Sequence, residues 1–146
     1  MSGNDQDFDD ERRREADRWL AVAIADMRAV RLCLDADEPM LGIAAYHCQQ
    51  AAEKVVKGML VMAGIPFAKT HDMTRLGDLA ASRYAEFQPL LAELGRLTVW
   101  GYAYRYPGLE DALEPEPPPE ALVAALQTID RLADNLCLLI AANKNA

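Results

Sequence analysis

The sequence predicts an all-α fold: an up-and-down antiparallel bundle of four long helices and one short helix. Apolar residues recur at alternating spacings of three and four in four separate segments, which is the period of a helix with one buried face. No segment alternates between apolar and polar residues, and no Asn-Gly or Asp-Gly turn dipeptide occurs. The 146 residues suffice for one domain with its own core.

The segment 41–64 is predicted to be the central helix. Pro39 suits the first helical position, and Gly64 followed by Ile65-Pro66 marks the end. This helix has an apolar stripe, a polar face that carries Gln50, Glu53 and Lys57 with Lys54 beside it, and a line of small residues where another helix can approach closely. The apolar stripe comprises Leu41, Ala45, Cys48, Ala52, Val55, Met59 and Met62, and the small residues are Ala44, Ala51 and Gly58.

The remaining segments complete the bundle. Residues 1–10 are acidic and poor in apolar residues, so we predict a disordered tail before a single domain over 11–146. The other helices are predicted over 11–34, about 73–83, from 87 to the Tyr106-Pro107-Gly108 stop, and from 119 onward.

The predicted fourth helix carries its inner stripe at Phe87, Leu91, Leu94, Thr98 and Gly101. One more step of four along this stripe reaches Arg105. A charged residue that continues a buried stripe is unusual, so this position is of functional interest.

Composition limits the classes of function. The net charge of −8 is concentrated, because the segments 1–17 and 110–120 hold more than half of the 23 acids and three of the 15 bases. The rest is near neutral, which neither excludes nor requires a nucleic-acid partner. Charges interrupt every apolar stretch well before the ~18 residues of a membrane span. The polar first residues do not resemble a signal peptide, and three scattered cysteines suggest reduced, packed thiols in a cytoplasmic protein.

Three short motifs together resemble one family. QQAAEKVVKGML at 49–60, THDMTRL at 70–76 and YAYRYPG at 102–108 occur in this order, and an opening helix with Trp19, Ala23 and Asp26 agrees with them. The chain thereby resembles the HEPN domain, the "higher eukaryotes and prokaryotes nucleotide-binding" family, over roughly residues 15–142. The resemblance implies a helical bundle that is usually a homodimer. It also implies a role as the partner of a minimal nucleotidyltransferase, in some cases as the toxin of a toxin–antitoxin pair.

Other members of the family are metal-independent ribonucleases with an Arg followed four to six residues later by His. This chain departs from that pattern, because its histidines are His47 and His71 and none follows Arg96 or Arg105. RNA cleavage needs a group that moves the 2′-OH proton, and tyrosine, with a pKa of about 10, is a poor base at neutral pH. The departure argues against a ribonuclease.

Arg105 is the leading ligand-binding candidate, and Arg96 and Arg105 are weak catalytic candidates. The guanidinium of Arg105 would bind phosphate through two parallel hydrogen bonds in a cleft at the dimer interface. The alternative is an ion pair with Asp26 or Glu53 that fixes the helix end.

Tyr102, Tyr104 and Tyr106 surround Arg105 in the sequence. They could stack on a base or wall an interface. One of them could also accept a nucleotidyl group from the partner enzyme.

The polar face of the central helix is the second candidate region. Gln50, Lys54 and Lys57 could bind phosphate, or Glu53 and Lys57 could form an ordinary i,i+4 pair. His71 could contact a nucleotide, or the His71-Asp72 pair could cap the next helix.

We expect no cofactor and no metal, since the sequence has neither a Gly-rich phosphate loop nor the histidine spacing of a metal site. The predicted function is a nucleotide- or phosphate-binding module that partners a minimal nucleotidyltransferase. An RNA-cleaving toxin and a purely structural interaction protein are the alternatives.

Overall fold

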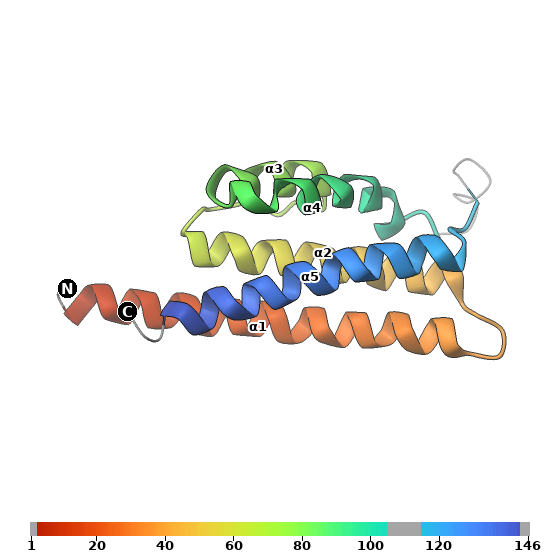
Figure 1. The fold of residues 1–146 in the computed structure, drawn as a ribbon, viewed down its shortest axis with the longest axis horizontal. Coiled ribbons are helices and arrows are strands. Elements are labelled where there is room, and N and C mark those ends of the chain that lie inside the picture. The colour runs from red at the N-terminus through yellow and green to blue at the C-terminus, as the bar shows by residue number, and fades with distance from the viewer. Residues whose placement is uncertain (1–2, 105–114, 144–146) are drawn as a thin grey trace.

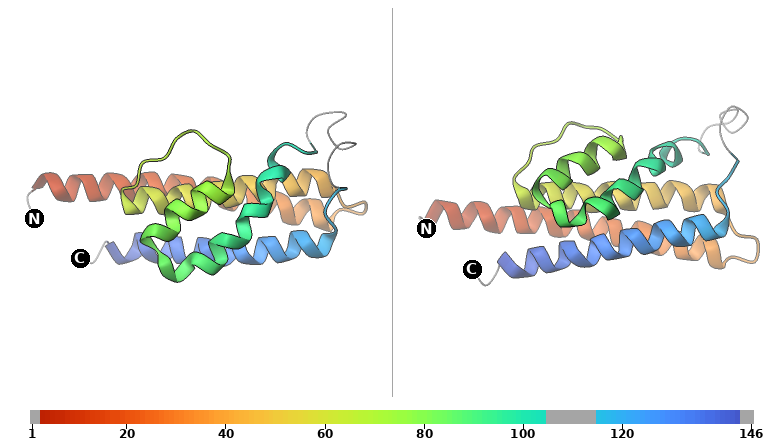
Figure 2. Two further views of the ribbon diagram at one scale, coloured as in Figure 1. Left: turned by 90° about the horizontal axis from the view of Figure 1, so that it is seen from above. Right: turned by 45° about the horizontal axis from the view of Figure 1, so that its top comes forward.

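The computed structural model describes residues 3–104 and 115–143, and over these residues it contains helices and no strand. Three long helices, α1 (Gly3–Asp35), α2 (Leu41–Ala63) and α5 (Pro119–Asn143), form an elongated layer (Figure 1). The shorter elements α3 (Met73–Arg83), η1 (Ala85–Phe87), α4 (Gln88–Glu93) and η2 (Leu94–Gly101) cover one side of this layer (Figure 2). The predicted all-α antiparallel bundle is confirmed.

α1 is longer than the sequence predicted. It begins at Gly3, so residues 3–10 form helix where a disordered tail was expected. Asp5 in the first turn interacts favourably with the helix dipole, and Asp10 pairs with Arg13 one turn later. The first turns of α1 extend beyond the C-terminal end of α5 (Figure 1).

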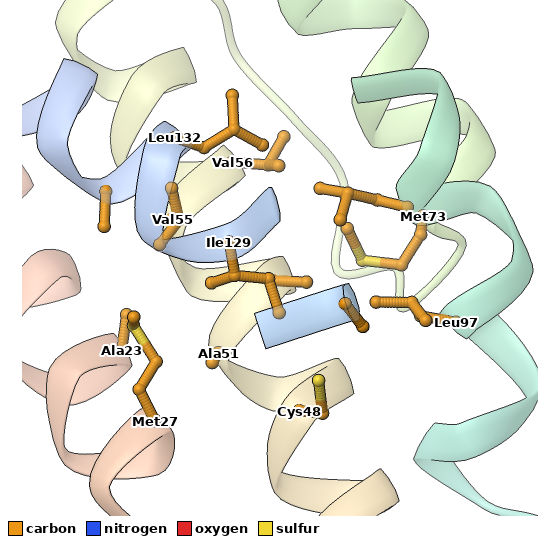
Figure 3. Packing of buried hydrophobic residues seen from close by; sticks show 14 of the residues in the cluster. Ala23, Met27, Cys48, Ala51, Val55, Val56, Met73, Leu97, Ile129 and Leu132 are labelled. Carbon is orange, nitrogen blue, oxygen red and sulfur yellow. The ribbon is translucent and has the colours of Figure 1, made fainter. Parts of the chain in front are cut away.

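α2 passes through the middle of the core and ends as predicted. Gly64 has a left-handed φ of 68°, and its N–H donates to the carbonyls at the end of the helix. The start differs, because Met40 is the N-cap and Pro39 precedes the helix. Figure 3 shows Ile129 of α5 among core side chains from α1, α2, α3 and η2.

The line of small residues on α2 lets the neighbouring helices approach, as predicted. A Cβ at Gly58 would lie 2.7 Å from Leu136 Cδ2 of α5 and 3.4 Å from Trp19 Cβ of α1. Leu136 is fully buried, and protein interiors contain few voids into which such a side chain could move.

The predicted fourth helix is three short pieces. After Glu93 the chain winds as a 3₁₀-helix, and burial repeats every third residue at Leu94, Leu97, Trp100 and Ala103. The α-helical prediction is therefore wrong beyond Glu93. The step of four that reached Arg105 does not describe this segment, and Arg105 itself lies outside the described residues.

None of the described helices is both long and apolar enough to cross a bilayer.

The expectation that all three cysteines are packed is wrong for Cys137, which is exposed on α5. Cys33 and Cys48 are buried, and burial raises the pKa of the Cys48 thiol to about 12 even though the positive charge of Arg96 opposes the shift. We therefore expect an alkylating reagent at mildly alkaline pH to label Cys137 rapidly and the two buried thiols only on unfolding. Mass spectrometry of the labelled peptides checks this, and rapid native labelling of Cys48 would contradict it.

Candidate functional site

The polar side of α2 carries two clusters of hydrogen-bonded charged groups. The first, the Asp26 cluster, joins α1 to α2 through one carboxylate. Asp26 Oδ1 lies 2.9 Å from His47 Nδ1, and Asp26 Oδ2 accepts from Lys54 Nζ at 2.6 Å. Asp26 is largely buried, whereas the side chains of His47 and Lys54 are 31% and 21% exposed. Because an ionised carboxylate only accepts, Nδ1 of His47 donates in this contact, and Nε2 takes no part in it.

The second, the Glu53 cluster, lies deeper. Lys57 Nζ donates to Glu53 Oε1 at 2.6 Å, Gln49 Nε2 donates to Oε2 at 3.1 Å, and His71 Nδ1 lies 3.0 Å from both oxygens. Gln50 extends the cluster by donating to Gln49 Oε1 at 2.8 Å. The carboxylate thus ties the connection 64–72 to α2 through His71. No buried polar side-chain atom of the described residues lacks a partner.

Two aromatic rings cover the ammonium group of Lys57. Its Nζ lies 5.7 Å from the ring centroids of both Trp19 in α1 and Phe67 in the connection. The rings meet edge to face, with centroids 6.4 Å apart. Lys57 therefore stabilises the fold where α1, α2 and the connection meet, and it is not exposed for a ligand.

The ionisation of Glu53 should make stability depend on pH. Burial tends to raise the pKa of Glu53, but hydrogen bonds from Lys57, His71 and Gln49 and the charge of Lys57 outweigh it and lower the pKa. The unfolded chain therefore binds the proton more readily, so the stabilisation is complete above the ordinary pKa of about 4.3 and is lost as pH falls below it. Urea unfolding across this range should show this loss, and Glu53→Gln should flatten the pH dependence. An unchanged dependence in Glu53→Gln would contradict the assignment.

A third group of residues lies on η2 and at its end. Since a 3₁₀-helix has three residues per turn, Arg96 and Val99 share one face, and Tyr102 follows as the C-cap residue with a non-helical φ of −140°. Arg96 and Tyr102 are exposed, Tyr102 by 44%, and within the described part of the chain Arg96 has no acidic partner. We call these three residues the η2 face.

The end of η2 and the residues that follow it contact α2 at two glycines, Gly101 and Gly42. A Cβ at Gly101 would lie 2.9 Å from Gln49 Oε1, so only glycine allows this approach without a shift. A Cβ at Gly42 would lie 3.0 Å from Tyr104 Cβ, and the Tyr104 hydroxyl donates to the carbonyl of Pro115. The η2 face therefore ends beside the polar side of α2.

The structure brings together some of the predicted ligand-binding residues. Gln50, Glu53, Lys57 and His71 share one cluster, while Lys54 belongs to the other. Asp72 is the N-cap of α3, as predicted. His71 takes no part in this cap and instead forms a hydrogen bond with Glu53 of α2. Arg105 and Tyr106 lie outside the described residues.

His47 and Gln49 are not among the site residues predicted from the sequence. Asp26 was considered as part of the family resemblance and as a partner for Arg105, and the structure shows that other side chains engage both Asp26 and Glu53. One signal was available: Asp26 directly precedes Met27 on the buried stripe of α1, where an acid needs partners from the facing helix. Over residues 3–104 and 115–143 no three His, Cys, Asp or Glu side chains are grouped to hold a metal.

Comparison with protein families decides the classification. The family model for the HEPN domain matches residues 16–132, from Ala16, the first buried residue of α1, to Leu132 in the middle of α5. The chain belongs to the HEPN domain family. Comparisons with curated proteins and with solved structures give no match. The HEPN match includes both polar clusters and the η2 face, and it associates the chain with nucleotide- or RNA-related functions.

Proposed function

We propose that this HEPN domain is a binding module for a nucleotide or its phosphates and acts as the partner of a minimal nucleotidyltransferase. The observation that carries the proposal is the η2 face. It pairs an exposed guanidinium, which has no acidic partner in the described residues, with the exposed phenol ring of the residue that follows η2. A guanidinium binds phosphate and an aromatic ring stacks on a base, so the two groups match the two ends of a nucleotide.

The surroundings of the η2 face support this role. The Gly101–Gln49 contact fixes the face against α2, and the hydrogen bonds of the Glu53 cluster hold Gln49 and Gln50 in place. A ligand there would meet side chains that are already ordered. Arg105 and Tyr106 follow Tyr104 directly in the sequence, and the proposal keeps them as ligand-binding residues.

A thermal-shift assay with nucleoside triphosphates at millimolar concentration tests the proposal. A ligand that binds only the folded chain raises the melting temperature. We expect a rise for the wild type, and its loss in Arg96→Ala, Tyr102→Ala and Arg105→Ala. Arg131→Ala, which removes an exposed arginine of α5, is the matched control. Its melting temperature should rise with nucleotide as that of the wild type does. No shift with any nucleotide would overturn the binding-module proposal.

The partner and the cellular setting need separate tests. The proposal includes a homodimer and a cytoplasmic location, where thiols stay reduced. We expect a neighbouring reading frame to encode a small nucleotidyltransferase that co-purifies with the chain. Failure to co-purify would exclude the role as a nucleotidyltransferase partner. Nucleotide binding would be unaffected by that result, because the thermal-shift assay tests it separately.

RNA cleavage is a second candidate because of one observation. Asp26 orients His47 through Nδ1, and within the described residues no hydrogen bond engages Nε2, so this nitrogen would be the proton acceptor that the sequence lacks after Arg96 and Arg105. If this reading is correct, the protein with EDTA present cleaves RNA, and His47→Gln abolishes the cleavage. RNA that stays intact with the wild type, or equal cleavage by His47→Gln, would exclude it.

A further inference from the structure

Three side chains of α2 form a line of hydrogen bonds that leads from the interior of the bundle to its surface. Glu53 is buried and accepts from Gln49 Nε2 at 3.1 Å, and Gln49 Oε1 accepts in turn from Gln50 Nε2 at 2.8 Å. Gln49 is fully buried, whereas Gln50 is half-buried. We call these three residues the amide relay. Its end at the surface is the amide group of Gln50.

The carboxylate of Glu53 fixes the direction of both amides. Burial opposes ionisation, but the hydrogen bonds that Glu53 accepts and the charge of Lys57 hold its pKa below the ordinary value, so it is ionised at neutral pH. A carboxylate only accepts, so Gln49 directs its NH₂ group to Glu53 and its oxygen to Gln50. Gln50 therefore donates to Gln49, and within the described residues no hydrogen bond engages its own oxygen, Oε1. A glutamine without such a partner could turn its amide over and present either end.

The amide relay lies beside the η2 face. A Cβ at Gly101 would lie 2.9 Å from Gln49 Oε1, and Tyr102 follows Gly101 directly with an exposed ring. Arg96 lies close enough to Cys48, the residue before Gln49, for its charge to oppose the rise in the pKa of that thiol. A nucleotide on the η2 face would therefore have its base near the surface end of the amide relay.

We propose that Gln50 selects adenine and cytosine over the corresponding oxo bases, hypoxanthine and uracil. Its Oε1 accepts from the exocyclic amino group of a base stacked on Tyr102, whereas a carbonyl oxygen in the place of that amino group would face a second acceptor. Gln49 and Glu53 are positioning residues, because they make the oxygen of Gln50, rather than its NH₂ group, available to the base. The inference rests on the proposed function, since it needs a nucleotide on the η2 face.

Isothermal titration calorimetry with two matched pairs of triphosphates tests this selection. ATP and ITP differ by an amino group replaced with a carbonyl, and so do CTP and UTP. We expect the wild type to bind ATP and CTP about tenfold more tightly than ITP and UTP, because the oxo base replaces a hydrogen bond with two facing acceptors. Gln50→Ala should bind all four with similar affinity, since Arg96 and Tyr102 remain. Equal wild-type affinities within each pair would overturn the inference and leave nucleotide binding standing.

Glu53→Gln gives a result that a purely structural role would not produce. Lys57 can bond only to the oxygen that remains, so the new amide nitrogen takes the position of Oε2 and donates to Gln49. Gln49 then turns its amide over and donates to Gln50 Oε1, which leaves the NH₂ group of Gln50 for the base. The preference should reverse, so that ITP and UTP bind more tightly than ATP and CTP. Weaker binding of all four nucleotides in the wild-type order would contradict the relay.

Controls separate selection from folding and from nucleotide binding itself. Arg131→Ala alters an exposed side chain of α5 and should keep the wild-type order of affinities. Circular dichroism checks that each variant is folded at the temperature of the titration. If Glu53→Gln is unfolded there, Gln50→Ala decides: retained discrimination in that variant would overturn the inference, and its loss would support it. Absence of binding by any of the four nucleotides would overturn the proposed function and this inference together.

Discussion

Glu53→Ala is expected to destabilise the protein by about 3–5 kcal/mol, because it leaves a buried ammonium group without its counter-ion. The Lys57 side chain is 9% exposed and that of Glu53 6% exposed, so water cannot replace the lost carboxylate. The substitution also removes the hydrogen bonds of Glu53 with His71 and Gln49. Loss of the His71 bond removes one of the contacts that hold the connection 64–72 against α2. Urea unfolding at neutral pH measures the loss.

Two comparisons test this mechanism. Glu53→Gln combined with Lys57→Met removes both charges at similar volume and should restore most of the stability. Asp26→Ala should cost less than Glu53→Ala, since Lys54 and His47 are exposed enough to be hydrated when their carboxylate is removed. A loss under about 1 kcal/mol in Glu53→Ala, or no recovery in the double variant, would contradict a buried ion pair.

Leu136→Ala is expected to cost about 2–5 kcal/mol, because Leu136 is fully buried where α5 packs against α2 and its truncation removes buried apolar contacts. Its Cδ2 fills the space above Gly58, so the substitution opens a cavity between the two helices. Thermal or urea unfolding checks the magnitude.

Gly58→Ala tests the same contact between α2 and α5 from the side of α2. Alone it should be destabilising, since the new methyl would overlap Leu136 Cδ2 at 2.7 Å and the overpacking outweighs the gain in helix propensity. Added to Leu136→Ala, the same methyl enters the vacated space and should recover part of the loss. Strictly additive effects of the two substitutions would show that the helices do not meet here.

The long helices could be predicted from the sequence because their buried residues recur with the single period of an α-helix. Ala52, Val55 and Met59 recur at helical spacing and are all buried, and Gly64 ends the helix in the left-handed conformation that favours glycine. The region 94–104 could not be predicted, because spacings of three fit both an α-helical stripe and a 3₁₀-helix. The contacts of Gly95 with Thr74 and of Gly101 with Gln49, both distant in sequence, accompany the tighter winding.

The candidate site was predicted in part for a similar reason. The i,i+4 spacing of Glu53 and Lys57 predicted their pair, since both belong to one helix. The joining of His47 to Asp26, of Lys54 to the same carboxylate, and of His71 to Glu53 depends on how separate elements pack. Local spacing does not contain that information.

The most direct test of the central claim is a titration of the ¹⁵N-labelled protein with ATP, followed by amide chemical shifts. We expect saturable changes at residues 96–102 and at Gln50, and no change at residues 12–22 of α1. Saturable changes elsewhere only, or none at millimolar ATP and the other nucleotides, would contradict a nucleotide site on the η2 face.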